Sequence, residues 1–199
     1  MDKKYTIRIL FPTLLHEYSF DEINRDEIIE YCYERKKIDK GVSYSNCGGW
    51  HSSPETITND NIITKTLGEG LKQSLFTSID YKCSADITYW ININPPKSYN
   101  TSHTHPDAHF SGVMWIKIPK DSGDLRFDSP HEFSGYIEIS SYIKEVQENT
   151  SAAPSFVITP EEGRMVTFPA SLRHDVSLNK SDEDRISISY NIRIDLNNK

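Results

Sequence analysis

Three histidines and an aspartate stand at alternate positions in one short stretch of the sequence, at His103, His105, Asp107 and His109. On a β-strand, side chains two residues apart point to the same face of the sheet. A strand over this stretch would therefore bring several imidazoles and a carboxylate toward one point. Imidazole nitrogens and carboxylate oxygens are common ligands of divalent transition metals, so the stretch predicts a metal site.

Another histidine, His174, lies far downstream and precedes a second strand-like run. Iron(II) sites used for oxygen chemistry combine two histidines with one carboxylate and leave the other coordination positions open. In sequence, such a site takes the form His-x-Asp followed at a distance by a second histidine. His105, Asp107 and His174 match this form, so we expect them to bind the metal and to carry the catalysis.

Arg185 and Ser187 stand two residues apart in the last strand-like run of the chain. At this spacing a guanidinium and a hydroxyl share one face of a strand. An arginine binds a carboxylate through two parallel hydrogen bonds, and a serine hydroxyl adds a third. A dicarboxylic co-substrate that chelates the metal through one end needs such a clamp at its other end, and these two residues are the candidates for it.

The N-terminal part of the chain predicts one strand and two helices that would support this site. Residues 5–11 alternate and are rich in strand-forming types, so they predict a first strand. A helix follows, with Ser19 or Asp21 as its N-terminal cap, basic residues in its last turn and Gly41 as its end. Residues 61–79 have leucine and isoleucine at helical spacing, and their two glycines predict a break in that helix.

Residues 41–60 are rich in glycine, serine, asparagine and proline, and they predict a loop. Within this loop, Trp50 and His51 are expected to be a packed tryptophan beside an exposed histidine. A role of this loop in contacting the substrate is the alternative.

The C-terminal half of the chain predicts strands and turns. Its strand-like runs are short, with turn residues between them: 86–94, the histidine stretch continued to residue 119, 125–127, 136–139, 155–160, 164–169, 174–178 and 185–196. This pattern is typical of a β-sandwich or jelly-roll barrel and not of a parallel α/β sheet. We expect one domain over residues 1–199, with 1–80 as helical support and 86–194 as the β core.

The composition indicates an intracellular globular protein. The 199 residues carry a formal net charge of -7, which argues against a nucleic-acid partner, because that contact requires clustered lysine and arginine. The three cysteines form no CxxC pair, and the sequence has neither a signal peptide nor the run of about 20 apolar residues that a membrane helix requires. We therefore expect a cytoplasmic location and no membrane partner. A homodimer is compatible with the sequence, which does not determine the oligomeric state.

Three stretches together resemble the 2-oxoglutarate/Fe(II)-dependent dioxygenases. They are HTHPDAHFSGVMWIKIP at 103–119, FPASLRHDV at 168–176 and RISISYNI at 185–192. More narrowly, they are similar to a small group of 2-oxoglutarate oxygenases from marine bacteria and their phages, which have an HxHPxxxxSG stretch and a closing RxSxSxN strand. The resemblance covers residues 86–194. It implies a mainly β, double-stranded β-helix of the cupin-like jelly-roll kind with flanking N-terminal helices, and it implies Fe(II) and 2-oxoglutarate as cofactor and co-substrate.

The resemblance leaves two sets of metal ligands open. In the narrower group the two histidines of HxHP are the shared feature, and an acid at the position of Asp107 is not expected in every member. The first set is His105, Asp107 and His174, and the second has His103 in place of Asp107. The first set is favoured, because Asp107 is in register with the wider superfamily. The residue that is not a ligand would then contact one.

Other residues of the predicted strands are candidates for contacts with the co-substrate. Trp115 falls where the superfamily often places an aromatic side chain beside the co-substrate, although a place in the core fits it equally well. His109 is expected to be exposed or to face the substrate rather than to bind the metal. Four polar strand residues are expected to face the barrel interior or its rim, either against the co-substrate or as ordinary edge polarity: Asn92, Asn94, Ser111 and Asn191.

The resemblance implies an oxidoreductase that hydroxylates an unidentified substrate and releases succinate and CO2, with Arg185 and Ser187 holding the distal carboxylate of 2-oxoglutarate. A cupin-like three-histidine metalloenzyme that does not use 2-oxoglutarate is one alternative, and a non-enzymatic β-sandwich binding or structural module is another. The expected location is the cytoplasm of a bacterium or of a phage-infected host cell. The substrate, a small molecule or a peptide, would be selected by loops 41–60 and 128–155, which carry no recognisable signal.

Overall fold

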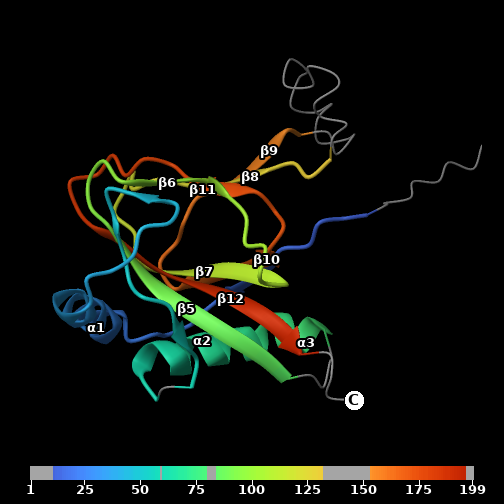
Figure 1. Ribbon diagram of the computed structural model, residues 1–199, viewed down its shortest axis with the longest axis horizontal. Helices are drawn as coiled ribbons and strands as arrows, with labels where there is room; N and C mark the ends of the chain where they lie inside the picture. The colour runs from blue at the N-terminus through green and yellow to red at the C-terminus, as the bar shows by residue number, and fades with distance from the viewer. Residues whose placement is uncertain (1–10, 59, 80–83, 132–152, 196–199) are drawn as a thin grey trace, which may run out of the picture.

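Two antiparallel sheets lie face to face in the computed structural model, which describes residues 11–58, 60–79, 84–131 and 153–195 (Figure 1). The larger sheet has seven strands in the order β1-β10-β7-β12-β5-β3, with β4 also paired to β5. These strands are β1 His16–Ser19, β3 Trp50–His51, β4 Glu55–Thr56, β5 Ser84–Asn94, β7 Phe110–Lys117, β10 Arg164–Pro169 and β12 Arg185–Asp195.

The smaller sheet has five strands in the order β2-β6-β11-β8-β9. These strands are β2 Asn46–Cys47, β6 Tyr99–His103, β8 Leu125–Asp128, β9 Ser155–Ile158 and β11 His174–Val176. From β5 to β12 the chain passes repeatedly from one sheet to the other, so each sheet combines strands from distant parts of the sequence. This arrangement is a double-stranded β-helix, and the predicted mainly β jelly-roll class is confirmed.

The two longest strands, β5 and β12, determine which side chains face the space between the sheets. They pair with each other along their whole length. In both strands the apolar residues alternate with polar ones, so the two sets point to opposite faces. The apolar set is buried with the helices in the larger core: Ile87, Tyr89, Ile91, Ile93, Ile186, Ile188, Tyr190 and Ile192. The opposite face, with Asn, Ser, Thr, Trp and Arg side chains, points between the sheets.

Helix α1, Arg25–Ile38, begins later than the sequence predicted. Its N-terminal cap is Asn24, whose Oδ1 accepts a hydrogen bond from the backbone N–H of Glu27 at 3.3 Å. Ser19 is in strand β1, and Asp21 lies several residues before the first helical turn. The prediction of either residue as the cap is therefore wrong. Basic residues do occupy the last turn, where they complement the helix dipole.

Helix α2, Ile62–Gln73, continues through its two glycines, where the sequence predicted a break. Gly70 lies against the larger sheet, and a Cβ atom there would be only 2.3 Å from the sulfur of Met165. Its missing side chain therefore allows close packing and does not end the helix. The break comes instead at Ser74, before the short helix α3, Leu75–Ile79. All three helices cover the outer face of the larger sheet (Figure 1).

Three other predictions concern segments beside this core. The predicted strand at 136–139 lies outside the described residues, and so does the strand at 5–11 except for its last residue. Residues 41–60, predicted as a loop, contain the two-residue strands β2, β3 and β4, which extend both sheets. In the described ranges, no helix has the length and apolar character needed to cross a lipid bilayer.

Candidate metal centre

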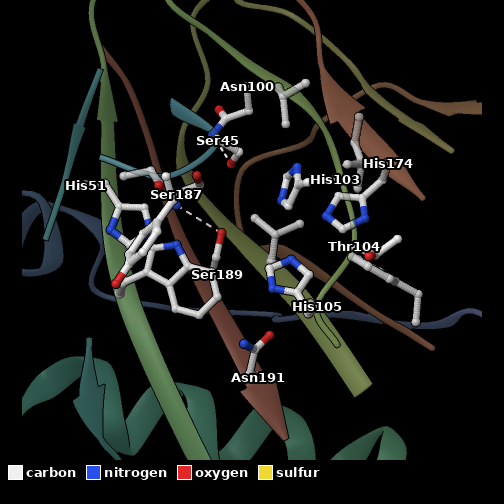
Figure 2. Close-up of a pocket in the computed structure, with 18 of the residues that line it drawn as sticks. Ser45, His51, Asn100, His103, Thr104, His105, His174, Ser187, Ser189 and Asn191 are labelled. Atoms are coloured by element: carbon white, nitrogen blue, oxygen red, sulfur yellow. Dashed lines mark hydrogen bonds between the residues drawn. The ribbon is translucent and has the colours of Figure 1, made fainter. Parts of the chain in front are cut away.

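A cavity of about 630 Å³ lies between the two sheets and opens to solvent. Strands β5, β7 and β12 of the larger sheet form one wall, and β6, β11 and the segment after β6 form the other. Figure 2 shows His103, His105 and His174 pointing toward one another on one side, with His51, Ser187 and Ser189 opposite them. The sequence-predicted residues therefore gather around one cavity.

Three histidines form a candidate metal site on one wall of this cavity. One ring nitrogen from each of His103, His105 and His174 lies within 4.8 Å of the other two. His103 and His174 are direct partners across strands β6 and β11, and their ring centroids are 4.4 Å apart. The His105 ring is 5.0 Å from His103 and 5.2 Å from His174. This geometry allows one divalent ion to contact all three rings.

Backbone carbonyls fix the orientation of two of these imidazoles. The Nδ1–H of His103 donates to the carbonyl oxygen of Thr101 at 2.7 Å, and that of His174 donates to the carbonyl oxygen of Leu172 at 2.8 Å. A carbonyl oxygen can only accept, so Nδ1 carries the proton in both rings. The lone pair of each Nε2 is therefore available to a metal.

The alternate spacing predicted that His103 and His105 share one strand, but in the structure they do not. Strand β6 ends at His103 and β7 begins at Phe110, and the chain turns at Pro106 between them. The backbone N–H of His105 donates to the carbonyl oxygen of Ala170 at 2.9 Å, just before the strand that carries His174. The prediction of four ligand-type residues on one strand face is therefore wrong, because proline interrupts the ladder.

Asp107 and His109 lie outside the three-histidine cluster. Asp107 is exposed at the mouth of the cavity. His109 is exposed, as predicted, and its Nδ1 accepts a hydrogen bond from the backbone N–H of Ile194 at 3.0 Å. The structure thus brings together the second ligand set considered from the sequence, which contains His103 in place of Asp107. Two members of this set are still two residues apart in sequence, but they are His103 and His105 and not His105 and Asp107.

A stack of rings holds His105 in place. Its imidazole lies almost parallel to that of His174, with an angle of 13° between the planes, and the Trp90 ring is tilted by 31° against it with ring centroids 5.8 Å apart. Trp90 in turn stacks on His51 at 5.3 Å and 11°. His51 is only 5% exposed and its Nδ1–H donates to the carbonyl oxygen of Ser52, so the prediction of an exposed His51 is wrong.

All three candidate ligands are uncharged at neutral pH. Burial and the nearby His174 and His103 lower the pKa of His105 to about 3. Burial is also the main cause that lowers the pKa of His174 to about 4, and it lowers the pKa of His103. A metal therefore has no proton to displace from these rings at pH 7.

We expect the metal-free protein to lose stability as the pH falls from 6.5 to 5. Unfolded histidines bind protons near their usual pKa of 6.5, whereas folded His105 and His174 do so only near 3 and 4. The unfolded state therefore binds more protons in this window, and the free energy of unfolding rises with pH. The melting temperature measured at each pH should fall toward pH 5, with a smaller slope in His174→Gln. A flat profile in the unsubstituted protein would contradict neutral buried imidazoles.

Arg185 lies buried at one end of the cavity without a carboxylate partner. Its side chain is 3% exposed, and its Nη1 donates to the backbone carbonyl oxygen of Ser122 at 2.8 Å. No described carboxylate forms an ion pair with it. Burial lowers the pKa of Arg185 to about 10 although the negative charge of the nearby Asp124 acts to raise it, so Arg185 remains charged at pH 7. A buried, unpaired guanidinium is unfavourable unless an anion binds to it, so this end of the cavity fits a carboxylate.

The turn that holds Arg185 depends on a glycine. Gly123 has φ = +102°, which disfavours any residue with a side chain. A Cβ atom at this position would lie 2.3 Å from the carbonyl oxygen of Ser177 and 2.9 Å from Nη1 of Arg185. Glycine therefore lets the backbone approach the guanidinium closely enough to accept its hydrogen bond.

Most of the remaining predicted co-substrate residues also lie at the cavity, but Asn94 does not line it and is buried beside Gly49. Ser187 and Trp115 line it, and Trp115 is at the same time buried in the smaller core cluster between the sheets. Asn92 and Asn191 line it too, and Ser111 supports Asn191 through a 2.8 Å hydrogen bond. Sequence reasoning missed Trp90 and the cavity position of His51. For Trp90 a signal existed, because it shares a strand face with Asn92.

The donor set suits an iron(II) enzyme with a dicarboxylate co-substrate. Imidazole nitrogen is a ligand type that binds iron well, and the clustered rings are neutral and oriented. Residues 88–191, just over half of the chain, match the model of a family described as "Putative 2OG-Fe(II) oxygenase". The chain belongs to this family. Its cofactor is therefore Fe(II) and its co-substrate is 2-oxoglutarate, as predicted.

Solved structures show the same fold at low sequence identity. A prolyl-4-hydroxylase from Pseudomonas putida has a TM-score of 0.61 and 13% identity, over 90% of this chain and 91% of that one. The non-haem α-ketoglutarate-dependent epimerase SnoN of nogalamycin biosynthesis has a TM-score of 0.62 and 9% identity, over 90% and 76%. HygX from Streptomyces hygroscopicus, with nickel, 2-oxoglutarate and hygromycin B bound, has a TM-score of 0.59 and 10% identity, over 91% and 83%. No curated protein sequence matches this chain.

Family membership favours one of the three functions considered from the sequence. It supports a 2-oxoglutarate-dependent oxygenase over a cupin-like metalloenzyme that does not use this co-substrate, and over a non-enzymatic β-sandwich module. The solved structures of this fold include an epimerase as well as a hydroxylase, so the fold by itself does not specify the reaction.

Proposed function

We propose that this oxygenase hydroxylates an organic substrate. One atom of O2 would enter a C–H bond of the substrate to give an alcohol, and the other would enter succinate as 2-oxoglutarate loses CO2. The observation that carries the proposal is the placement of a neutral three-imidazole cluster and a buried, unpaired Arg185 around the same cavity. The cluster fits a metal ion and the guanidinium fits the far carboxylate of a chelating co-substrate.

His103, His105 and His174 are the proposed iron ligands. When bound there, Fe(II) supplies the redox chemistry by which O2 oxidises 2-oxoglutarate and the substrate. The protein's contribution is to present three unprotonated nitrogens, two of them fixed by Nδ1–H bonds to backbone carbonyls. Three neutral ligands leave the double positive charge of the ion uncompensated, and the dicarboxylate co-substrate would balance it.

Arg185 and Ser187 are the proposed binding groups for the distal carboxylate of 2-oxoglutarate. They follow each other on the same face of β12 and both are buried in the cavity wall. Trp115, Leu125 and Phe168 line the same cavity and would exclude water from the methylene groups of the co-substrate. A guanidinium already held by Ser122 needs little reorganisation to bind the carboxylate.

An anaerobic titration tests the iron and co-substrate parts of the proposal. Adding Fe(II) and 2-oxoglutarate to the metal-free protein should produce a weak visible charge-transfer band. Exposure to O2 should then consume O2 and release succinate in equal amounts, and mass spectrometry of the true product should show a gain of one oxygen atom. A well-folded protein that forms no band and no succinate would contradict the proposal, and a product without added oxygen would contradict hydroxylation alone.

A further inference from the structure

The cavity continues along β5 and β12 beyond the proposed iron and co-substrate residues. On β12, Arg185 and Ser187 are followed on the same face by Ser189 and Asn191, which pair with Trp90 and Thr88 of β5. Figure 2 shows Asn191 past His105, on the side away from Ser187. We call these four residues, Thr88, Trp90, Ser189 and Asn191, the distal end of the cavity. It leaves room for a molecule other than 2-oxoglutarate.

No charged side chain lies at the distal end. Among the described residues that line the whole cavity, the only Asp, Glu, Lys or Arg side chains are those of Arg185, at the opposite end, and Asp107, exposed at the mouth. A phosphate or carboxylate bound at the distal end would therefore lack a cationic side chain as partner among the described residues. Burying an unpaired anion is strongly unfavourable, so the distal end favours uncharged groups on the substrate.

Hydrogen bonds within the wall fix what the distal end offers to a ligand. The Oγ of Ser189 accepts from Nδ2 of Asn92 at 2.9 Å, which leaves its own O–H free to donate. The Oδ1 of Asn191 accepts from Ser111 at 2.8 Å, which orients its NH2 group as a donor. Side chains two residues apart on one strand are about 6.6 Å apart. The wall thus presents two donors at that spacing.

His51 provides a hydrogen-bond acceptor in addition to these two donors. Its Nδ1–H is donated to the carbonyl oxygen of Ser52 at 2.7 Å, and burial lowers its pKa, so its Nε2 is an acceptor on the cavity wall. A ligand that uses both kinds of group must accept from Ser189 and Asn191 and donate to His51. A hydroxyl group does both through a single oxygen atom, whereas an amide needs its separate oxygen and nitrogen.

We propose that the distal end binds the oxygenase substrate, and that this substrate is an uncharged polyhydroxy compound of the sugar or cyclitol type. The proposal rests on the proposed function above. Hydroxyls spaced around a ring match donors about 6.6 Å apart and the His51 acceptor, which comes from strand β3 of the same sheet. Phosphorylated or carboxylated derivatives of the same compound would bind more weakly, because the described residues offer no cationic side chain at the distal end.

The test compares matched compounds on one carbon skeleton. The Fe(II)- and 2-oxoglutarate-loaded protein is mixed with neutral sugars and cyclitols, with their monophosphates and with the corresponding uronates, and O2 uptake is measured. We expect at least one neutral compound to stimulate uptake, with its anionic derivatives at least tenfold weaker. Stimulation by anionic members of the panel, or by no neutral member, would overturn the inference.

Variants locate the effect at the distal end. Asn191→Asp and Ser189→Ala should each raise the KM for the stimulating neutral compound at least about tenfold, the expected loss for one hydrogen bond or for an introduced charge. Both should keep the visible band and the KM for 2-oxoglutarate. Asn24→Asp adds the same charge at the cap of α1, where aspartate also caps a helix, and should change neither KM. An unchanged substrate KM in both distal variants would overturn the inference.

Different results would contradict the proposed oxygenase function and the proposed substrate class. If the loaded protein forms no visible band and no succinate, the proposed function is overturned and the substrate inference falls with it. If the band forms and 2-oxoglutarate is slowly consumed without substrate, the function stands. The panel and the variants then decide the substrate class alone.

Discussion

Replacing Arg185 with methionine is expected to raise the KM for 2-oxoglutarate by about 100-fold. Removing one partner of a buried, hydrogen-bonded charge pair weakens binding by about 2–5 kcal/mol, and each 1.4 kcal/mol is a factor of ten. Arg185 is the described cation on the cavity wall, so no other side chain there replaces it. Succinate release measured against 2-oxoglutarate concentration gives the KM directly.

The same substitution should not destabilise the metal-free protein. Arg185 is buried with a backbone carbonyl as its hydrogen-bond partner, and replacing an unpaired buried charge with an apolar side chain of similar length is neutral or stabilising. We therefore expect an unchanged or higher melting temperature without 2-oxoglutarate. Arg193→Met, on an exposed position of the same strand, is the control and should leave the KM within about threefold. A KM equally unaffected in Arg185→Met would exclude this residue as the carboxylate anchor.

Replacing His103 with alanine is expected to lower Fe(II) affinity by more than about 100-fold, since losing a ligand exceeds the 10- to 100-fold effect of losing a residue that only supports one. Asp107→Ala should leave the affinity within about threefold, because Asp107 is exposed and outside the cluster. This pair of variants is decisive, because His105 and His174 belong to both ligand sets considered from the sequence. Anaerobic calorimetry on metal-free protein gives both affinities.

The opposite result would restore the ligand set that the sequence favoured. If Asp107→Ala abolished binding and His103→Ala did not, the loop at Pro106 would have to rearrange when the metal binds. Melting temperatures of the metal-free variants control for misfolding. We expect His103→Ala to remain folded, because it replaces a partly buried ring at the end of strand β6 and not a residue of the main core.

The sequence by itself determined the parts of this protein that depend on local periodicity. Alternation along 86–94 and 185–195 separates an isoleucine-rich face from a polar face, and the structure has these faces against the helices and the cavity. The same period of two places Arg185 and Ser187 on one wall. These features could be predicted because neighbouring side chains on a strand point to opposite faces whatever the strand packs against.

Tertiary structure decided which residues meet around the proposed metal. Periodicity does not say where a strand ends, so the alternate histidines suggested one continuous strand, whereas the chain leaves the smaller sheet after His103 and turns at Pro106. The pairing of β6 with β11 then sets His103 opposite His174, and the hydrogen bond to Ala170 brings in His105. Asp107 remains at the rim.

Long-range packing also decided the surroundings of the site. His51 comes from a segment with the composition of a loop, yet pairing of β3 with β5 buries it on the cavity wall beside Trp90. Arg185 obtains its hydrogen bond from a turn more than sixty residues earlier in the chain. Such contacts depend on the register between strands far apart in sequence, which local patterns do not encode. The sequence thus specified the residue types of the site and the strand faces that carry them. The pairing of strands distant in sequence determined which of these residues meet at the site.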